Sequence, residues 1–222
     1  EKYFSASTKD ALSIGNDGFL RRWTVLEPIS KPNQGNTVFV DSYLNEVFAK
    51  EYFKNQMTCL PKDGDKVKAV AEIVEMPADF RRMPDPSQIK RTFKNETLVW
   101  HKIDSKTFNL KLMRFGEFHK QRLYGVIYWV VTVINCENDM ENVRLSVGSN
   151  SASKWWVNGE EALLLSGDRR MVADDGMSER LNLKKGENII RGAIINGPGM
   201  TDFCVRFVDE NGKVITNGIT IK

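Results

Sequence analysis

The chain has 222 residues, of which 41% are hydrophobic and 27% charged, a balance typical of folded globular proteins and not of disordered ones. Its 32 lysines and arginines against 29 acidic residues leave a net charge of +3, too small for strong electrostatic attraction to nucleic acid or to a membrane. The length predicts one all-β domain spanning residues 1–222, with room for an insertion, rather than two full domains.

The longest strongly apolar run, residues 125–134, is ten residues long. Because a membrane-spanning helix needs ~20 such residues, we predict a buried strand and no transmembrane segment. The three cysteines, Cys59, Cys136 and Cys204, are far apart, so they form neither a zinc pattern nor a complete disulfide framework. The chain starts at Glu1 without methionine, which is typical of a chain that has lost a leader, and we expect a secreted, periplasmic or cell-surface protein.

The N-terminal quarter carries one strand signal and one helix signal. A turn at Asn16-Asp17-Gly18 precedes the β-prone alternating run 19–26. A short helix is predicted after a cap at residues 41–42, because the apolar residues that follow recur every three or four positions. These helix residues are Tyr43, Leu44, Val47, Phe48 and Tyr52.

Residues 50–96 show a weaker pattern, and we predict an irregular insertion there with a strand at 67–74. Prolines at 77, 84 and 86 break regular structure. A cluster of basic residues surrounds the single acid Asp85, and we interpret it as a solvated loop, with contact to an acidic ligand as the alternative. The basic residues are Arg81, Arg82, Lys90, Arg91 and Lys94.

From residue 97 onward, short strands alternate with turn signals such as Asn158-Gly159. This pattern indicates an antiparallel sandwich or barrel, and the absence of strand–helix alternation disfavours a parallel nucleotide-binding sheet. The predicted strands are 98–103, 107–114, 125–135, 142–147, 153–157, 162–165, 179–183, 188–195, 202–208 and 214–219.

The segments NVRLSVGSN (142–150) and KWWVNGE (154–160) closely resemble a signature of galactose-binding-like jelly rolls, in which a strand ends in a Gly-Ser turn and the next carries an aromatic residue before an Asn-Gly hairpin. LKKGENII (183–190) and DFCVRF (202–207) look like the same family's last strands, and FLRRWTVLEP (19–28) also resembles it. The resemblance implies a mainly β fold, an antiparallel jelly-roll β-sandwich with one short N-terminal helix and an irregular insertion at about 50–96.

More narrowly, the chain is similar to accessory regions of bacterial proteins labelled acetylxylan esterase, which occur in polysaccharide-degrading systems. This resemblance implies a polysaccharide or oligosaccharide partner and a catalytic partner domain that the label describes. It assigns no residue-level ligand positions, because the shared motif is structural.

Alternation along the strand at 153–157 separates its two tryptophans. The pleat puts Trp155 and Val157 on one face, which we assign to the core, and Trp156 on the other. Trp156 either packs beneath a neighbouring segment, which we favour because indoles are usually buried, or stands at the outer face and stacks on a sugar ring.

Motifs for nucleophilic hydrolysis are missing from the sequence. Gly-x-Ser-x-Gly does not occur. The two imidazoles, His101 in a predicted strand and His119 in a predicted turn, are interpreted as incidental polar residues. We therefore assign no catalytic residue.

Acidic residues in the C-terminal half of the chain suggest two further functions, glycoside hydrolysis and calcium binding. Asp174, Asp175, Glu179 and Asp202 are the carboxylates that we would nominate for glycoside hydrolysis. Asp174-Asp175-Gly176 also supplies hard oxygens, but it lacks the spaced acidic pattern of a dedicated calcium loop. We assign no metal ligand and no cofactor, and a structural calcium remains the alternative.

The loop at 166–178 and its bordering strands carry the side chains that suit a sugar site. Planar aromatic groups stack on sugar rings, and charged or amide groups form bidentate hydrogen bonds with hydroxyl pairs. Pairing between Arg169 and Asp175 that merely orders the loop is the interpretation we prefer. The predicted ligand-binding residues are Trp156, Arg169, Arg170, Asp174, Asp175 and Arg180.

The function predicted from these observations is a non-catalytic carbohydrate-binding or accessory domain of an exported polysaccharide-degradation system. Two alternatives stay open. One is a carbohydrate esterase, or a fragment of one, and the other is a module that docks protein rather than glycan.

Overall fold

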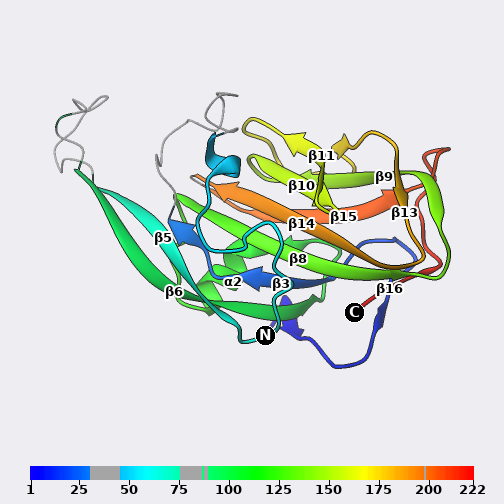
Figure 1. The fold of residues 1–222 in the computed structure, drawn as a ribbon, viewed down its shortest axis with the longest axis horizontal. Helices are drawn as coiled ribbons and strands as arrows, with labels where there is room; N and C mark the ends of the chain where they lie inside the picture. The colour runs from blue at the N-terminus through cyan, green and yellow to red at the C-terminus, as the bar shows by residue number, and fades with distance from the viewer. Residues whose placement is uncertain (31–45, 76–86, 88–89, 198) are drawn as a thin grey trace.

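The computed structural model describes residues 1–30, 46–75, 87, 90–197 and 199–222. Two antiparallel β-sheets pack against each other (Figure 1), and the described helical residues lie at 46–49 and in α2, Leu112–Phe118. The predicted mainly β, antiparallel sandwich is therefore confirmed. The finer assignment to a galactose-binding-like topology and the single-domain organisation stay predictions.

The larger sheet has 11 strands, and its main path runs in the order β1-β6-β3-β8-β14-β10-β11. Its long central pair is β8 and β14, which pair along their whole lengths. The path strands are β1 Phe4–Ala6, β6 Lys90–Ser105, β3 Arg22–Leu26, β8 Val126–Cys136, β14 Gly186–Asn196, β10 Ser153–Val157 and β11 Glu160–Leu165. The strands beside this path are β2 Leu12–Ser13, β4 Ile29–Ser30, β5 Lys66–Glu75 and β16 Ile219–Ile221.

The smaller sheet has five strands, with β9 and β15 at its centre. β15 pairs with β9 on one side and with β7 on the other. The strands are β7 Leu110–Lys111, β9 Met140–Ser149, β12 Gly176–Met177, β13 Leu181–Leu183 and β15 Asp202–Val208. This sheet covers one face of the larger one.

The main core fills the space between the two sheets. Trp23 from β3 and Trp155 from β10 meet edge to face at 5.9 Å, and both contact Phe203 from β15, at 5.1 and 5.3 Å between ring centroids. The Trp155 ring lies against Gly192 of β14, where a Cβ atom would stand 2.4 Å from the indole. Trp155 therefore occupies its predicted place in the core, and only glycine fits beneath it.

The opposite face of the larger sheet is also covered, by the segment 46–60. In Figure 1 this segment crosses in front of β14 and β8. Its Phe53 packs edge to face on Trp100 and Trp129 at 5.9 and 6.2 Å, and Trp129 stacks on Trp156 at 5.7 Å. Trp156 is only 7% exposed, so the favoured interpretation, burial beneath a neighbouring segment, is confirmed.

The segment 46–60 contains the described part of the predicted helix. Residues 46–49 are helical, and Val47, Phe48 and Tyr52 are buried in the outer core. The other predicted helix residues, Asp41, Ser42, Tyr43 and Leu44, lie outside the described residues.

The insertion is more regular than predicted. β5 and β6 pair from Lys66↔Val99 to Glu75↔Lys90, forming a long two-stranded ribbon that extends to one side of the molecule (Figure 1). On this ribbon Phe93 is 63% exposed, whereas its cross-strand partner Glu72 is only 4% exposed. Within the basic cluster, Lys90 and Lys94 are exposed on β6, whereas Arg81, Arg82 and Asp85 and the side chain of Arg91 lie outside what is described.

The strand predicted at 107–114 is mostly wrong. Only β7, two residues long, is extended there, and α2 begins at Leu112. Leu110 and Leu112 alternate as in a strand, but Leu112 and Phe115 are three positions apart and both are buried, which is the spacing of one helix face. The last strand also shifts: β16 covers Ile219–Ile221, whereas Val214 makes only an isolated bridge with Val208.

Side-chain hydrogen bonds connect two turns of the C-terminal half, the Asn-Gly hairpin and the Lys-Gly turn. Asn158 and Gly159 adopt φ angles of 50° and 83°, as a two-residue hairpin requires. The Asn158 amide donates to Asn188 Oδ1 at 2.9 Å, and the buried Asn188 amide donates to the carbonyls of Lys184 and Gly186 at 2.8 and 3.2 Å. Asn188 thus joins the Asn-Gly hairpin to the Lys-Gly turn that starts β14.

Candidate functional site

The loop 166–178 lies on the end of the smaller sheet. It crosses β9 so closely that a Cβ atom on Gly148 would stand 2.0 Å from the carbonyl oxygen of Val172. The Ser151 N–H donates to the Arg169 carbonyl at 3.3 Å, and β12 continues the loop as a strand paired with β9. A glycine in the underlying strand therefore fixes the position of this loop.

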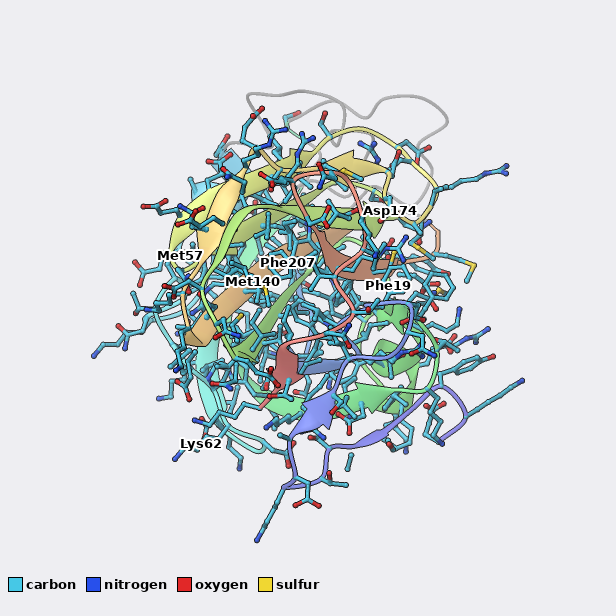
Figure 2. All side chains as sticks on the ribbon, turned by 90° about the vertical axis from the view of Figure 1, so that its right-hand side faces the viewer. Phe19, Met57, Lys62, Met140, Asp174 and Phe207 are labelled. Atoms are coloured by element: carbon cyan, nitrogen blue, oxygen red, sulfur yellow. The ribbon has the colours of Figure 1, made fainter. Side chains whose placement is uncertain are left out.

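Asp174 anchors the loop to the smaller sheet. Asp174 has a φ of 60°. Its carboxylate accepts hydrogen bonds from Arg206 Nε at 2.9 Å, from Arg206 Nη2 and from Ser146 Oγ at 2.6 Å. Hydrogen bonding by the Arg206 guanidinium holds the pKa of Asp174 below its ordinary value. The same guanidinium lies 4.4 Å from the Phe19 ring, and Figure 2 shows Asp174 and Phe19 on the same side of the molecule.

Arg169 and Asp175 form the ion pair that we preferred on sequence grounds. Arg169 Nε lies 2.7 Å from Asp175 Oδ2, and Arg169 Nη1 donates to the Ser166 carbonyl at 2.8 Å. That interpretation is confirmed. Each of the two adjacent aspartates therefore faces a different guanidinium, and the calcium alternative at this place stays a prediction.

A cavity of about 370 Å³ opens beside this loop at the rim of the sandwich. We call it the rim cavity. Within the described residues, the side chains of Asp168 and Arg170 make no hydrogen bond or ion pair, and Asn150 engages only its Oδ1, which accepts from the Asp202 N–H at 3.0 Å. Met200, 55% exposed, supplies an apolar surface. The lining residues are Asn150, Ser151, Asp168, Arg169, Arg170, Gly199 and Met200.

The structure brings together part of the predicted ligand-binding set. Arg169 and Arg170 line the rim cavity, and Asp175 is ion-paired beside it. Arg180 lines a different cavity of about 460 Å³, together with several acidic side chains of β11 and the β12–β13 connection, and Trp156 lies in the outer core. The predicted set is therefore not a single site.

Five of the seven lining residues were not predicted from the sequence, namely Asn150, Ser151, Asp168, Gly199 and Met200. Asp168 lies within the loop at 166–178 that was predicted from the sequence, and only its position in that loop could have indicated it. Asn150 and Met200 come from loops that flank β9 and β15, so only the pairing of those strands brings them to the cavity.

Of the carboxylates considered for glycoside hydrolysis, Asp174 and Asp202 are held by different partners on different parts of the smaller sheet. Asp174 binds Arg206, whereas Asp202 accepts hydrogen bonds from Asn109 at 3.0 Å and Lys111 at 3.3 Å. Asp202 and Arg206 are four residues apart on β15, roughly 13 Å along an extended strand. Burial raises the pKa of Asp202, in the opposite direction to that of Asp174.

A second polar cluster was not predicted, because His101 and His119 were interpreted as separate, incidental residues and Glu27 was not considered. Glu27 follows β3, His101 lies in β6 and His119 follows α2, and one possible ligand atom from each lies within 4.8 Å of the others. His101 Nε2 is 3.1 Å from Glu27 Oε1, and the two imidazole rings stack at 3.8 Å with 28° between their planes. Burial and the neighbouring His101 lower the pKa of His119. We call these three residues the histidine cluster.

Comparison with known proteins finds no matching family model and no matching curated protein. Two solved structures align with nearly the whole chain, each with 11% sequence identity and a TM-score of 0.40. One is described as the PA14 domain of the antifreeze protein MpAFP, and the alignment covers 98% of this chain and 95% of that one. The other is described as the PA14 sugar-binding domain from an RTX adhesin, with coverages of 90% and 96%.

Among the described residues, no helix is long and apolar enough to cross a membrane.

Proposed function

We propose that this chain is a non-catalytic carbohydrate-binding domain and that it binds glycan hydroxyl groups in the rim cavity. In the finer form of the proposal, it is an exported accessory domain that holds polysaccharide near a catalytic partner domain, as the resemblance to acetylxylan esterase-labelled proteins implies. Its partner is a polysaccharide or oligosaccharide.

The observation that carries the proposal is the set of unengaged polar groups around the rim cavity. A carboxylate, a guanidinium and an amide nitrogen, from Asp168, Arg170 and Asn150, make no hydrogen bonds among the described residues. Together they offer both donors and acceptors to a hydroxyl pair, and charged groups make the stronger hydrogen bonds. The cavity volume of about 370 Å³ is within the usual range of small-ligand sites.

The rigid surroundings of the rim cavity also support the proposal. Arg169 is fixed by its ion pair with Asp175, and the loop rests directly on Gly148. A site that is already ordered loses less conformational entropy when the ligand binds. Trp156 has no part in this site, because it is buried on the other side of the larger sheet.

Affinity electrophoresis in gels containing xylan or other plant and microbial polysaccharides tests the proposal. We expect retention of the wild-type chain by at least one glycan. Arg170→Ala should weaken binding about tenfold or more, because a hydrogen bond to a charged group contributes about 1.5–3 kcal/mol and each 1.4 kcal/mol is a factor of ten.

Arg180→Ala is the matched control, since Arg180 is an exposed arginine predicted from the sequence together with Arg170 but lies outside the rim cavity. It should leave retention unchanged. Equal loss in both variants, or no retention by any glycan, would contradict the proposal. Release of acetate from acetylated xylan by the purified wild-type chain would establish the esterase alternative instead.

A further inference from the structure

We propose that Glu27, His101 and His119 form a binding site for one divalent transition-metal ion, with Zn²⁺ as the expected occupant. The site lies where β3, β6 and α2 meet, and it shares no residue with the lining of the rim cavity. It is independent of the proposed carbohydrate binding, so either proposal can fail without the other.

The strand pairing between β3 and β6 fixes the first two ligands. Glu27 follows Leu26, which pairs with Trp100, and its backbone N–H donates to the Val99 carbonyl at 3.1 Å. The Val99 N–H in turn donates to Glu27 Oε2 at 3.0 Å. One carboxylate oxygen is therefore held by the backbone, and the other, Oε1, points at the imidazole of His101.

The distance between these two ligands already suits a shared ion. Zn–N and Zn–O bonds of about 2.0–2.1 Å in tetrahedral geometry place two ligand atoms about 3.3 Å apart. His101 Nε2 and Glu27 Oε1 are 3.1 Å apart. An ion between them needs almost no movement of the two strands.

The third ligand comes from the end of α2. The backbone N–H of His119 donates to the Phe115 carbonyl at 3.1 Å, which positions the residue, while its ring nitrogens make no hydrogen bond within the described part of the chain. The ring contacts Phe115 at 4.6 Å and Phe118 at 5.0 Å, so apolar groups pack beside it. An imidazole with two free nitrogens beside a carboxylate is available as a ligand.

Binding requires one change, a turn of the His119 ring. An ion lies in the plane of the imidazole that binds it, whereas the two rings are now stacked with only 28° between their planes. Rotation about the terminal side-chain torsion is soft for histidine. Bringing ligand atoms that now lie within 4.8 Å to about 3.3 Å is within the reach of such a rotation.

The ligand types select the ion. Two imidazoles with one carboxylate suit Zn²⁺ and related first-row ions, whereas Mg²⁺ and Ca²⁺ prefer oxygen ligands alone. Three protein ligands also leave a fourth position for water, and the His101 side chain is 22% exposed, so water can reach the ion. The bound ion would fasten the end of α2 to the β3–β6 pair.

Isothermal titration of the chelator-treated, tag-free chain with Zn²⁺ tests the site. We expect one ion per chain, a higher melting temperature in its presence, and a visible d–d absorption band when Co²⁺ replaces Zn²⁺. His119→Gln should weaken Zn²⁺ binding by more than about tenfold, because even loss of a group that only orients a ligand costs 10–100-fold, and it should abolish the Co²⁺ band.

Two controls separate this site from other metal binding. Glu117→Gln removes an exposed carboxylate of α2 outside the cluster, and Cys59→Ser removes the partly exposed thiol. Both variants should bind Zn²⁺ like the wild type. His119 is partly exposed at the end of a short helix, so its variant should fold, which circular dichroism checks. Absence of one-to-one binding by the wild type, or unchanged binding by His119→Gln, would overturn the proposal.

Discussion

The two faces of the larger sheet are both buried, but they are covered in different ways. On the inner face, the five-stranded sheet closes the core with continuous strand ladders. On the outer face, the segment 46–60 covers the core and is attached by isolated hydrogen bonds. For example, the Val70 N–H donates to the Tyr52 carbonyl at 2.9 Å, and Arg191 Nη2 donates to the Cys59 carbonyl at 2.7 Å. The same strands thus support one rigid cover and one locally attached cover.

The indole groups of the two faces show the same difference. On the inner face, Trp23 Nε1 donates to the Leu20 carbonyl at 2.7 Å and Trp155 Nε1 donates to Ser153 Oγ at 2.9 Å. On the outer face, Trp129 Nε1 is buried with no partner in the described structure. A buried donor without a partner costs free energy. The inner core contains such a group as well, the Tyr128 hydroxyl, so the difference concerns these indoles and not every polar group of the two cores. Trp155 and Trp156 are neighbours on β10 but lie in the inner and the outer core, respectively. Substitutions at these two positions therefore compare the packing of the two faces.

The largest effect is expected at Trp155. Trp155→Ala should lower the free energy of unfolding by about 3–5 kcal/mol, because it removes a fully buried indole from between two sheets that cannot close the gap. It also leaves Ser153 Oγ without its indole donor. Urea unfolding followed by tryptophan fluorescence and circular dichroism measures the change. A loss below about 1 kcal/mol would show that the inner face relaxes as easily as the outer one.

A smaller effect is expected at Trp156. Trp156→Ala should cost about 2–3 kcal/mol, at or below the usual range for a buried tryptophan, since the cost depends on how far the surroundings can collapse and a single covering segment moves more easily than a sheet. The same urea titration compares the two variants directly. Equal or larger destabilisation than in Trp155→Ala would contradict the distinction between the two faces.

The smallest effect is expected at Asp174, where an ion pair, rather than apolar packing, holds the loop 166–178 to the smaller sheet. Asp174→Asn should cost on the order of 1 kcal/mol near neutral pH, since the ion pair with Arg206 is partly solvent-exposed. Because the folded-state pKa of Asp174 lies below its unfolded value, this stabilisation is present above about pH 4 and is lost as the pH falls through the folded pKa. The difference between wild type and variant should therefore shrink in urea titrations at pH 3.

Asp202 provides the control of opposite sign. Its folded-state pKa is raised by burial, so its contribution is most favourable below its unfolded pKa and decreases as the pH rises through the folded pKa. The stability difference between wild type and Asp202→Asn should therefore fall, not rise, from pH 3 to neutral pH. A difference for Asp174→Asn that grows on acidification would contradict the assigned role of the Arg206 pair.

The strands whose bounds were predicted well are those that are indicated by residues close to them in the sequence. The strands at 153–157 and 202–208 have the predicted bounds, because short runs of strand-forming residues between turn residues indicate them without reference to distant partners. The region 107–114 was misjudged, since the alternation of Leu110 and Leu112 is too short to distinguish a strand end from the first turn of α2. Short apolar runs are ambiguous in this way.

The sites were harder to predict because they are assembled from distant segments. Glu27 and His101 are 74 residues apart and meet only through the β3–β6 pairing, and His119 joins them through a helix that the sequence did not reveal. In the rim cavity, the two arginines of the loop, Arg169 and Arg170, were found from composition, whereas Asn150 and Met200 were not, because nothing local marks them as neighbours. Long-range pairing, rather than residue type, was the missing information.

The side chain of Asn188 links the opening of the Asn-Gly hairpin to that of the Lys-Gly turn. Since its side chain bonds both to Asn158 and to the carbonyls of Lys184 and Gly186, neither turn can open without breaking the other's contacts. The turn around Gly212 is different, because the hydrogen bonds that close it in the described part of the chain come from Asp209 and its immediate neighbours. We therefore expect the first two turns to open together and the third to open independently of them.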